Sequence, residues 1–431
     1  MVVLILVTSF VLLFVLGVPI AFCLGISTLA TMLMTMDIIP AVTTISQRMA
    51  GGVDSFALLA IPLFILSGQL MAQGGIARRI IDFAKAVVGS LPGGLAFVNV
   101  VSCALFGAIS GSAVAATSAI GGFMIPEMNK EGYDRDFNAA VTATASTTGM
   151  LIPPSNILIV YAVASGGVSI AALFVAGYAP GILVAVSLMV VCAVYARRQG
   201  FPAGARVPFR VLMHCTFAAL PSLFLIVLVI GGILGGVFTA TEAGAIAVLY
   251  AWLLSAVFYR EINLADLGKI LLRSAETTAI VMFLVATSMA MSWLLAYQNI
   301  PATVAETLIG LSDNPIVILL LINLVLLMVG IFMDMTPAVL IFTPIFLPVA
   351  VELGMSPLHF GIMMVLNLCI GLCTPPVGSI LFVACAIAKT GIGKIVKPML
   401  PMYAAMFLAL MVVTYIPEFS EFLPRFFGLM D

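Results

Sequence analysis

The stretch Ile109-Ser110-Gly111-Ser112 interrupts an apolar segment, and a similar interruption, Ile331-Phe332-Met333-Asp334, follows 222 residues later. Each is followed by glycines and prolines at matched distances, and no gap is needed to align the two segments. The matched residues are Pro126, Gly132, Gly149 and Pro153-Pro154 in the first segment, and Pro348, Gly354, Gly371 and Pro375-Pro376 in the second. Because glycine and proline determine where helices end or bend, both segments should break at equivalent points.

The composition predicts an all-α polytopic membrane protein. Apolar residues make up 63% and charged residues 8% of the 431 residues, against roughly 45–50% and about 25% in soluble domains. Apolar runs of about 20 residues recur along the chain, and each can cross about 30 Å of hydrocarbon. The net charge of −1 offers no basic surface for nucleic acid, and the seven cysteines form no metal-ligand pattern.

The apolar runs predict ten membrane crossings and two re-entrant hairpins. The predicted crossings are residues 2–16, 17–36, 56–73, 137–164, 171–195, 217–236, 239–258, 276–296, 360–387 and 399–416. The segments 95–128 and 316–350 are apolar but broken in the middle, so each is interpreted as a hairpin that enters and leaves the membrane on one side. The crossings 137–164 and 360–387 contain the proline pairs and are predicted to be discontinuous helices.

The distribution of basic residues sets the predicted orientation. With both termini on the periplasmic side, 15 of the 17 basic residues fall in cytoplasmic loops, and only Arg48 and Arg425 fall outside. Cytoplasmic loops of membrane proteins carry such an excess of Lys and Arg. If only one of the two segments were a hairpin, the downstream loops would invert and the bias would be lost.

The same topology predicts two inverted repeats. Residues 1–199 form the first repeat, 200–211 a cytoplasmic linker and 212–431 the second repeat. The first hairpin then opens to the cytoplasm and the second to the periplasm. Paired hydrophobic segments interrupted by Gly and Pro in two halves indicate the midplane site of a secondary transporter.

The breaks are expected to supply oxygen ligands for a small cation. Proline removes an intrahelical hydrogen bond, and the freed carbonyls in hydrocarbon need a polar partner. Carbonyl and hydroxyl oxygens suit a small hard cation such as Na⁺. The first set is Ser110, Ser112, Gly149, Ile152 and Pro154, and the mirrored set is Phe332, Asp334, Gly371, Thr374 and Pro376. The alternative is a pair of proline kinks whose free groups bond to neighbouring Ser and Thr residues.

Two acidic residues have competing interpretations. Asp334 lies at membrane depth, where a carboxylate indicates function, but it could also cap the half-helix that starts at Met335. The two roles are compatible. Glu242 lies near the end of a predicted crossing and is interpreted as a helix-start or interhelical anchor rather than a ligand.

At these residues the chain resembles the large membrane subunit of tripartite ATP-independent periplasmic (TRAP) transporters, the DctM-type permease. The matching stretches are Ala60-Ile61-Pro62-Leu63-Phe64, Leu91-Pro92-Gly93-Gly94-Leu95-Ala96, Ser110-Gly111-Ser112-Ala113, Ile152-Pro153-Pro154-Ser155, Thr241-Glu242-Ala243, Asp334 with Thr336-Pro337, His359-Phe360-Gly361 and Thr374-Pro375-Pro376-Val377-Gly378. They span nearly the whole chain.

The resemblance implies Na⁺-driven import of small organic carboxylates, such as a C4-dicarboxylate or sialic acid, by an elevator mechanism in the bacterial inner membrane. It implies two partners, a DctQ-type small subunit of about four helices and a DctP-type periplasmic binding protein. The family's first Na⁺ site maps onto Ser110, Ser112, Gly149, Ile152 and Pro154, and a second maps onto Gly371, Thr374 and Pro376. The residues expected to contact substrate are Ala113, Ser155, Asn156, Thr336, Pro337 and Gly378.

Other classes of membrane protein fit the sequence less well. A channel needs a continuous polar pore, whereas the polar breaks stop at the midplane from opposite sides. An intramembrane aspartyl protease needs two facing acids, but the residue that mirrors Asp334 is Ser112. A primary pump needs a nucleotide domain, and Thr390–Ile395 lacks the P-loop spacing. The chain is therefore not expected to be an enzyme and needs no organic cofactor. The remaining alternative is an H⁺-coupled organic anion carrier that acts without a binding protein.

Overall fold

A computed structural model describes residues 2–201, 204, 207–312, 314–375 and 377–430, and all their regular elements are helices. Helices in the first half of the chain are α1 Val2–Val15, α2 Ile20–Leu33, α3 Ile38–Val53, η1 Phe56–Leu59, α4 Ala60–Gln73, α5 Ile76–Val88, α6 Gly94–Ser110, α7 Ala113–Lys130, α8 Arg135–Thr148, α9 Asn156–Ala164 and α10 Ile170–Gln199. Those in the second half are α11 Phe209–Leu234, α12 Ala240–Trp252, η2 Leu253–Phe258, α13 Leu264–Tyr297, α14 Ile300–Leu311, α15 Pro315–Phe332, α16 Met335–Glu352, α17 Pro357–Leu372, α18 Ser379–Ala388, α19 Ile392–Tyr415 and α20 Glu418–Phe426.

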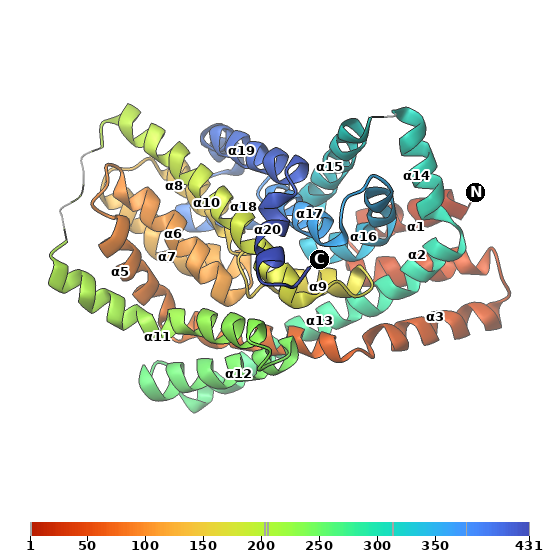
Figure 1. Cartoon of the computed structure of the whole chain (residues 1–431), viewed down its shortest axis with the longest axis horizontal. Helices are drawn as coiled ribbons and strands as arrows, with labels where there is room; N and C mark the ends of the chain where they lie inside the picture. Colours follow the sequence, from red (N-terminus) through yellow and green to blue (C-terminus); the bar gives the residue numbers. More distant parts are fainter. Residues whose placement is uncertain (1, 202–203, 205–206, 313, 376, 431) are drawn as a thin grey trace.

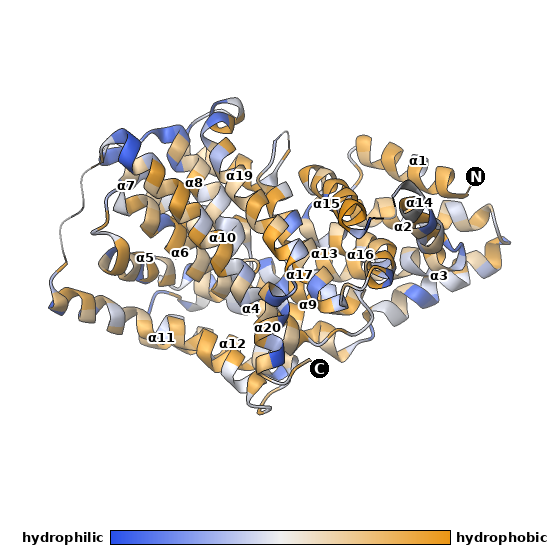
Figure 2. Cartoon of the chain, turned by 45° about the horizontal axis from the view of Figure 1, so that its top comes forward, coloured by the Kyte–Doolittle hydropathy of each residue, from blue (hydrophilic) through white to orange (hydrophobic). Residues whose placement is uncertain are grey.

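The helices are those of a membrane protein. Within the described residues, 8 helical segments are long and apolar enough to cross a bilayer. Large apolar side chains such as Leu220 and Val227 of α11 are 50% and 62% exposed, which suits contact with lipid. Figure 2 shows apolar residues over most of the helices, with hydrophilic residues gathered at helix ends, as where α7 is followed by α8. The predicted fold class, a polytopic helical transporter, is confirmed.

Each predicted hairpin is a pair of contacting helices. Helices α6 and α7 pack together and are separated only by Gly111 and Ser112. Gly111 has a φ of 61°, a conformation that glycine adopts without steric cost. Helices α15 and α16 pack in the same way and are separated only by Met333 and Asp334. The polar interruptions therefore become the tips of the two helix pairs.

Both discontinuous helices are interrupted where the glycine and proline pattern indicates. Helix α8 ends at Thr148 and α9 begins at Asn156, and α17 ends at Leu372 and α18 begins at Ser379. The segment 149–155, here named the first break, contains Pro153 and Pro154. The segment 373–378, the second break, contains Pro375 and Pro376. The structural position of Pro376 lies outside the described residues.

Helix boundaries follow the offset of 222 residues along much of the chain. Helix α7 spans residues 113–130 and α16 spans 335–352, and α10 and α19 start at residues 170 and 392. The Sγ of Cys369 lies 3.5 Å from the carbonyl oxygen of Thr147, the residue 222 positions earlier. The inverted orientation of the two halves stays a prediction, and part of the linker, residues 202–203 and 205–206, lies outside the described residues.

Four amphipathic helices occupy segments that the hydropathy pattern left as loops. They are α3, α5, α14 and α20. Helix α5 buries Ile76, Ile80 and Ala84 on one face and carries charged residues on the other. A search for runs of about 20 apolar residues misses such helices because only one of their faces is apolar.

Most of the helices belong to one of two groups of contacting helices (Figure 1). One group, here named the frame, consists of α1–α4 and α11–α13, in which α4 contacts α12 and α13 contacts α2, α3 and α4. The other group, the hairpin core, consists of the two helix pairs, the discontinuous helices, α10 and α19. The groups meet where α4 contacts α6 and α9, where α13 contacts α16 and where α11 contacts α6 and α10. Helix α5 contacts α6 and α11, α14 contacts α16, and α20 contacts α10.

Candidate functional site

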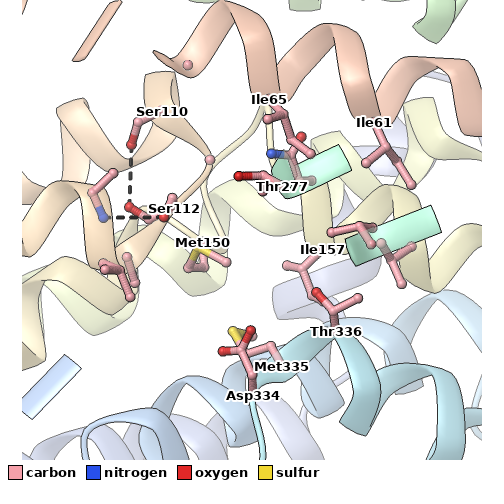
Figure 3. Close-up of a pocket in the computed structure, with 18 of the residues that line it drawn as sticks. Ile61, Ile65, Ser110, Ser112, Met150, Ile157, Thr277, Asp334, Met335 and Thr336 are labelled. Atoms are coloured by element: carbon pink, nitrogen blue, oxygen red, sulfur yellow. Dashed lines mark hydrogen bonds between the residues drawn. The ribbon is translucent and has the colours of Figure 1, made fainter. Parts of the chain in front are cut away.

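A cavity of about 200 Å³ lies where the frame meets both hairpin tips. Figure 3 shows Ser110 and Ser112 on one side of it, with Ile61 across from them and Asp334 below. Its lining residues are Ile61, Ile65, Gly68, Gln69, Ala72, Ser110, Gly111, Ser112, Ala113, Val114, Ala115, Met150, Asn156, Ile157, Val160, Thr277, Val281, Asp334, Met335, Thr336 and Leu372.

The first tip presents two hydroxyl groups held by local hydrogen bonds. Ser110 is the last residue of α6, and its Oγ donates a hydrogen bond of 3.4 Å to the carbonyl oxygen of Ser112. Ser112 is the N-cap of α7, and its Oγ accepts from the Ala115 N–H at 3.3 Å. Both bonds are drawn in Figure 3. Each hydroxyl oxygen keeps a lone pair that can bind a cation.

The first break packs against the last turns of α6. A Cβ on Gly149 would lie 2.3 Å from Gly107 Cα, so the two backbones touch where only glycine fits. Among the described residues, the carbonyl oxygens of Gly149, Ile152 and Pro154 accept no hydrogen bond. The Oγ of Ser155 donates a hydrogen bond of 2.5 Å to the Met150 carbonyl. Three carbonyls at this break are therefore free to bind a cation.

The second tip presents a carboxylate without a capping role. Asp334 occupies the N-cap position of α16, but its side chain makes no capping hydrogen bond. Its side chain is exposed and lines the cavity. Glu242 differs, since it forms a capping box with Thr239 in which its Oε2 accepts from the Thr239 N–H at 2.8 Å. The interpretation of Glu242 as a helix-start residue is confirmed.

The second break repeats the glycine contact of the first. A Cβ on Gly371 would lie 2.6 Å from Gly330 Cα of α15. The Thr374 N–H donates to the Gly371 carbonyl at 2.9 Å, and Thr374 Oγ1 donates to the Ile370 carbonyl at 2.7 Å. The Gly378 N–H reaches the Ile331 carbonyl at 3.4 Å. The Gly371 carbonyl therefore already accepts a hydrogen bond, whereas the equivalent Gly149 carbonyl of the first break accepts none among the described residues.

The predicted residues divide into those that line the cavity and those around it. The cavity-lining ones are Ser110, Ser112, Ala113, Asn156, Asp334 and Thr336. Those outside its lining are Gly149, Ile152, Pro154, Ser155, Phe332, Pro337, Gly371, Thr374 and Gly378. The Ile152 side chain lies toward α10, because a Cβ on Gly181 would lie 2.5 Å from Ile152 Cγ1. Only main-chain groups of Ile152 and Pro154 offer oxygens. The ligand roles of both sets stay predictions.

The frame contributes lining residues that the sequence analysis did not identify. Gln69 and Gly68 come from α4, and Thr277 comes from α13. A Cβ on Gly68 would lie 2.5 Å from the Ser110 carbonyl oxygen, so α4 runs directly against the first tip. One signal was present in the sequence, since Gln69 is an uncharged polar residue inside the apolar run 56–73.

The fold and the cavity between two hairpin tips are those of a polytopic helical transporter. The chain belongs to the family described as the tripartite ATP-independent periplasmic transporter, DctM component, whose model matches residues 7–419. It is therefore a large permease subunit of this family and not an enzyme, as the resemblance of its motifs implied.

Known proteins resemble the chain over most of its length. It is 53% identical over 420 residues to the protein YgiK of Salmonella typhimurium, covering 97% of this chain and 96% of that one. It is 43% identical over 376 residues to the C4-dicarboxylate TRAP transporter large permease protein DctM of Pseudomonas aeruginosa, covering 87% and 88%. The solved YdaH transporter of Alcanivorax borkumensis matches with a TM-score of 0.63 and 16% identity, covering 87% and 88%, a likeness of fold alone.

Proposed function

We propose that the chain imports small organic carboxylates by coupling them to Na⁺. The observation that carries the proposal is the set of free oxygen groups at the two tips, which line one cavity, and at the first break. The first tip and the first break offer two hydroxyls and three unbonded carbonyls, and the second tip offers the uncapped carboxylate of Asp334. Oxygen ligands at interrupted helices are typical of Na⁺ sites in secondary transporters.

Each Na⁺ would join a hairpin tip to the break beside it. At the first site the hydroxyls of Ser110 and Ser112 would be held near carbonyls of Gly149, Ile152 and Pro154 by the Gly107–Gly149 contact. At the second site Asp334, Gly371 and Thr374 would take the same role. Na⁺ would bind the remaining lone pairs of these oxygens, which would favour the arrangement that binds substrate.

The substrate would bind in the cavity beside these ions. The N-termini of α7 and α16, and of α9 at Asn156, meet there. Helix N-termini attract anions through free N–H groups and the helix dipole. Contacts are expected from Ala113, Asn156 and Thr336. The relative from Pseudomonas aeruginosa is named for C4-dicarboxylates, and a carboxylate fits the same kind of site here.

The proposed transport cycle moves the hairpin core against the frame. The core contains both tips, and the frame contacts it along α4 and α13, so a rigid displacement of the core would carry the cavity across the membrane. The proposed setting is the bacterial inner membrane with both termini in the periplasm. The proposed partners are a DctQ-type small membrane subunit and a DctP-type binding protein that delivers the substrate.

Uptake into proteoliposomes tests the proposal against an H⁺-coupled carrier that needs no binding protein. The vesicles would contain this chain and its small subunit, with the binding protein supplied outside. Uptake is expected under an inward Na⁺ gradient and not with K⁺ alone. Equal uptake in sodium-free buffer under a proton gradient, without the binding protein, would establish the alternative.

A further inference from the structure

The cavity has a polar side and an apolar side. Hydroxyl and amide groups of Ser110, Ser112 and Asn156 face it from the hairpin core, and the Oδ1 of Asn156 has no hydrogen-bond partner among the described residues. Ile61 and Ile65 of α4 line it from the frame and are 1% and 8% exposed. The polar lining residues of the frame are Gln69 and Thr277, and the Oγ1 of Thr277 already donates to the Arg273 carbonyl at 2.9 Å.

The described side chains that line the cavity carry negative charge and no positive charge. Its described lining residues include one ionisable side chain, Asp334, and no Lys, Arg or His. A Na⁺ at Asp334 would leave that site neutral. A Na⁺ at the first site would be bound only by neutral oxygens and would keep its single positive charge. One carboxylate would therefore be balanced by a full positive charge, and a second would meet only the weaker partial charges of the helix N-termini at the cavity.

The cavity volume also limits the substrate. A cavity of about 150 Å³ holds one benzene molecule, so about 200 Å³ holds a ligand only slightly larger. That corresponds to an organic acid of about four to six carbons by the same comparison. A sugar acid such as sialic acid would extend well beyond this space, which is partly open.

From these observations we propose that this permease selects small aliphatic monocarboxylates itself, independently of its binding protein. The carboxylate lies toward the Ser112 hydroxyl and the Nδ2 of Asn156, which can donate hydrogen bonds to it, and the aliphatic part lies against Ile61 and Ile65. This assignment rests on the proposed Na⁺ coupling, which supplies the single positive charge. The proposed substrate has one carboxylate, whereas the Pseudomonas aeruginosa relative is named for C4-dicarboxylates.

Ligand binding to the purified complex of this chain with its small subunit, without a binding protein, tests the assignment. Calorimetry at saturating Na⁺ and in K⁺ would compare 3-methylbutanoate with succinate, which is of similar size but has a second carboxylate. We expect 3-methylbutanoate to bind at least roughly 10-fold more tightly, because the second charge finds no partner. N-acetylneuraminate should not bind.

A pair of matched variants tests the apolar side. Ile65→Ala should weaken binding of 3-methylbutanoate roughly 10-fold, because it removes apolar contact in the pocket. Ile230→Ala is the control, since Ile230 has the same exposure of 8% but lies on α11 away from the cavity. Thermal unfolding of both variants reports any general loss of stability.

Each result bears on one step of the reasoning. Equal or tighter binding of succinate, still dependent on Na⁺, overturns the monocarboxylate assignment and leaves Na⁺ coupling standing. A preference for 3-methylbutanoate that is the same in K⁺ overturns the coupling and the charge argument together. Absence of binding by either acid, with folded protein, overturns the cavity as the carboxylate site. An equal loss of affinity for 3-methylbutanoate in Ile65→Ala and Ile230→Ala would show that Ile65 does not contact the ligand.

Discussion

Replacing Gly149 with alanine should disrupt the first Na⁺ site through the backbone alone. Gly149 has helical torsion angles, φ −68° and ψ −14°, so alanine causes no local strain. Its Cβ would lie 2.3 Å from Gly107 Cα, whereas ordinary contact begins at 3.4 Å. The first break and α6 must therefore separate by about 1.1 Å. Such overpacking typically lowers the free energy of unfolding by about 1–3 kcal/mol.

The same displacement is large compared with what an ion site tolerates. Ligand distances in metal sites stay within about 0.2 Å of their ideal values. A shift of about 1.1 Å would move the Gly149 carbonyl out of reach of an ion held by Ser110. We expect the apparent Na⁺ affinity for uptake to fall roughly 10- to 100-fold, the range seen when groups that position metal ligands are changed.

The assay measures uptake against Na⁺ concentration in proteoliposomes, together with thermal unfolding of the purified protein. Gly122→Ala is the matched control, because Gly122 lies in α7 and nothing lies within 4 Å of a Cβ built there. It should leave the Na⁺ dependence unchanged. An unchanged Na⁺ dependence in Gly149→Ala, with normal folding, would show that the first break is a structural kink and not part of a Na⁺ site.

Further predictions concern ligands, topology and packing. Ser112→Ala and Thr374→Val each remove one hydroxyl at nearly constant size. Each should weaken the apparent free energy of Na⁺ binding by roughly 1–3 kcal/mol while expression changes little. Normal Na⁺ titrations of both variants would contradict this. In a protein free of its native cysteines, Lys130→Cys should react with an impermeant reagent only from the cytoplasm and Ser356→Cys only from the periplasm. If both cysteines react from the same side, the two halves are not inverted repeats. Glu421→Ala should lower the unfolding temperature, since this buried carboxylate accepts a hydrogen bond from the Ser356 hydroxyl at 2.5 Å. An unchanged unfolding temperature would show that this hydrogen bond does not stabilise the fold.

Glycine and proline positions predicted the breaks well because their effect on a helix is local. The segment 95–128 was expected as a hairpin, and α6 and α7 span Gly94 to Lys130 with a turn at Gly111. The steric reason for Gly149 was not visible in the sequence, because its partner Gly107 approaches only when α6 packs on α8. Local chemistry therefore located the breaks, and tertiary packing explains why glycine is required there.

The frame side of the cavity could not be predicted from the sequence. Gln69 and Thr277 lie on α4 and α13, more than 200 residues apart, and meet only because those helices pack together. The amphipathic helices were missed for a different reason. Helix α20 combines charged residues with exposed Phe422 and Phe426, at 62% and 73%, and its mixed composition resembles a loop in a hydropathy search.

Simultaneous measurement of sodium and carboxylate flux shows whether the two are transported together. Proteoliposomes with this chain and its small subunit, and binding protein outside, would receive radioactive sodium and a labelled carboxylate that the binding protein delivers. We expect that substrate stimulates sodium entry and that more than one Na⁺ enters with each carboxylate, because one Na⁺ site is proposed at each hairpin tip. Carboxylate entry without any substrate-dependent sodium flux would contradict it.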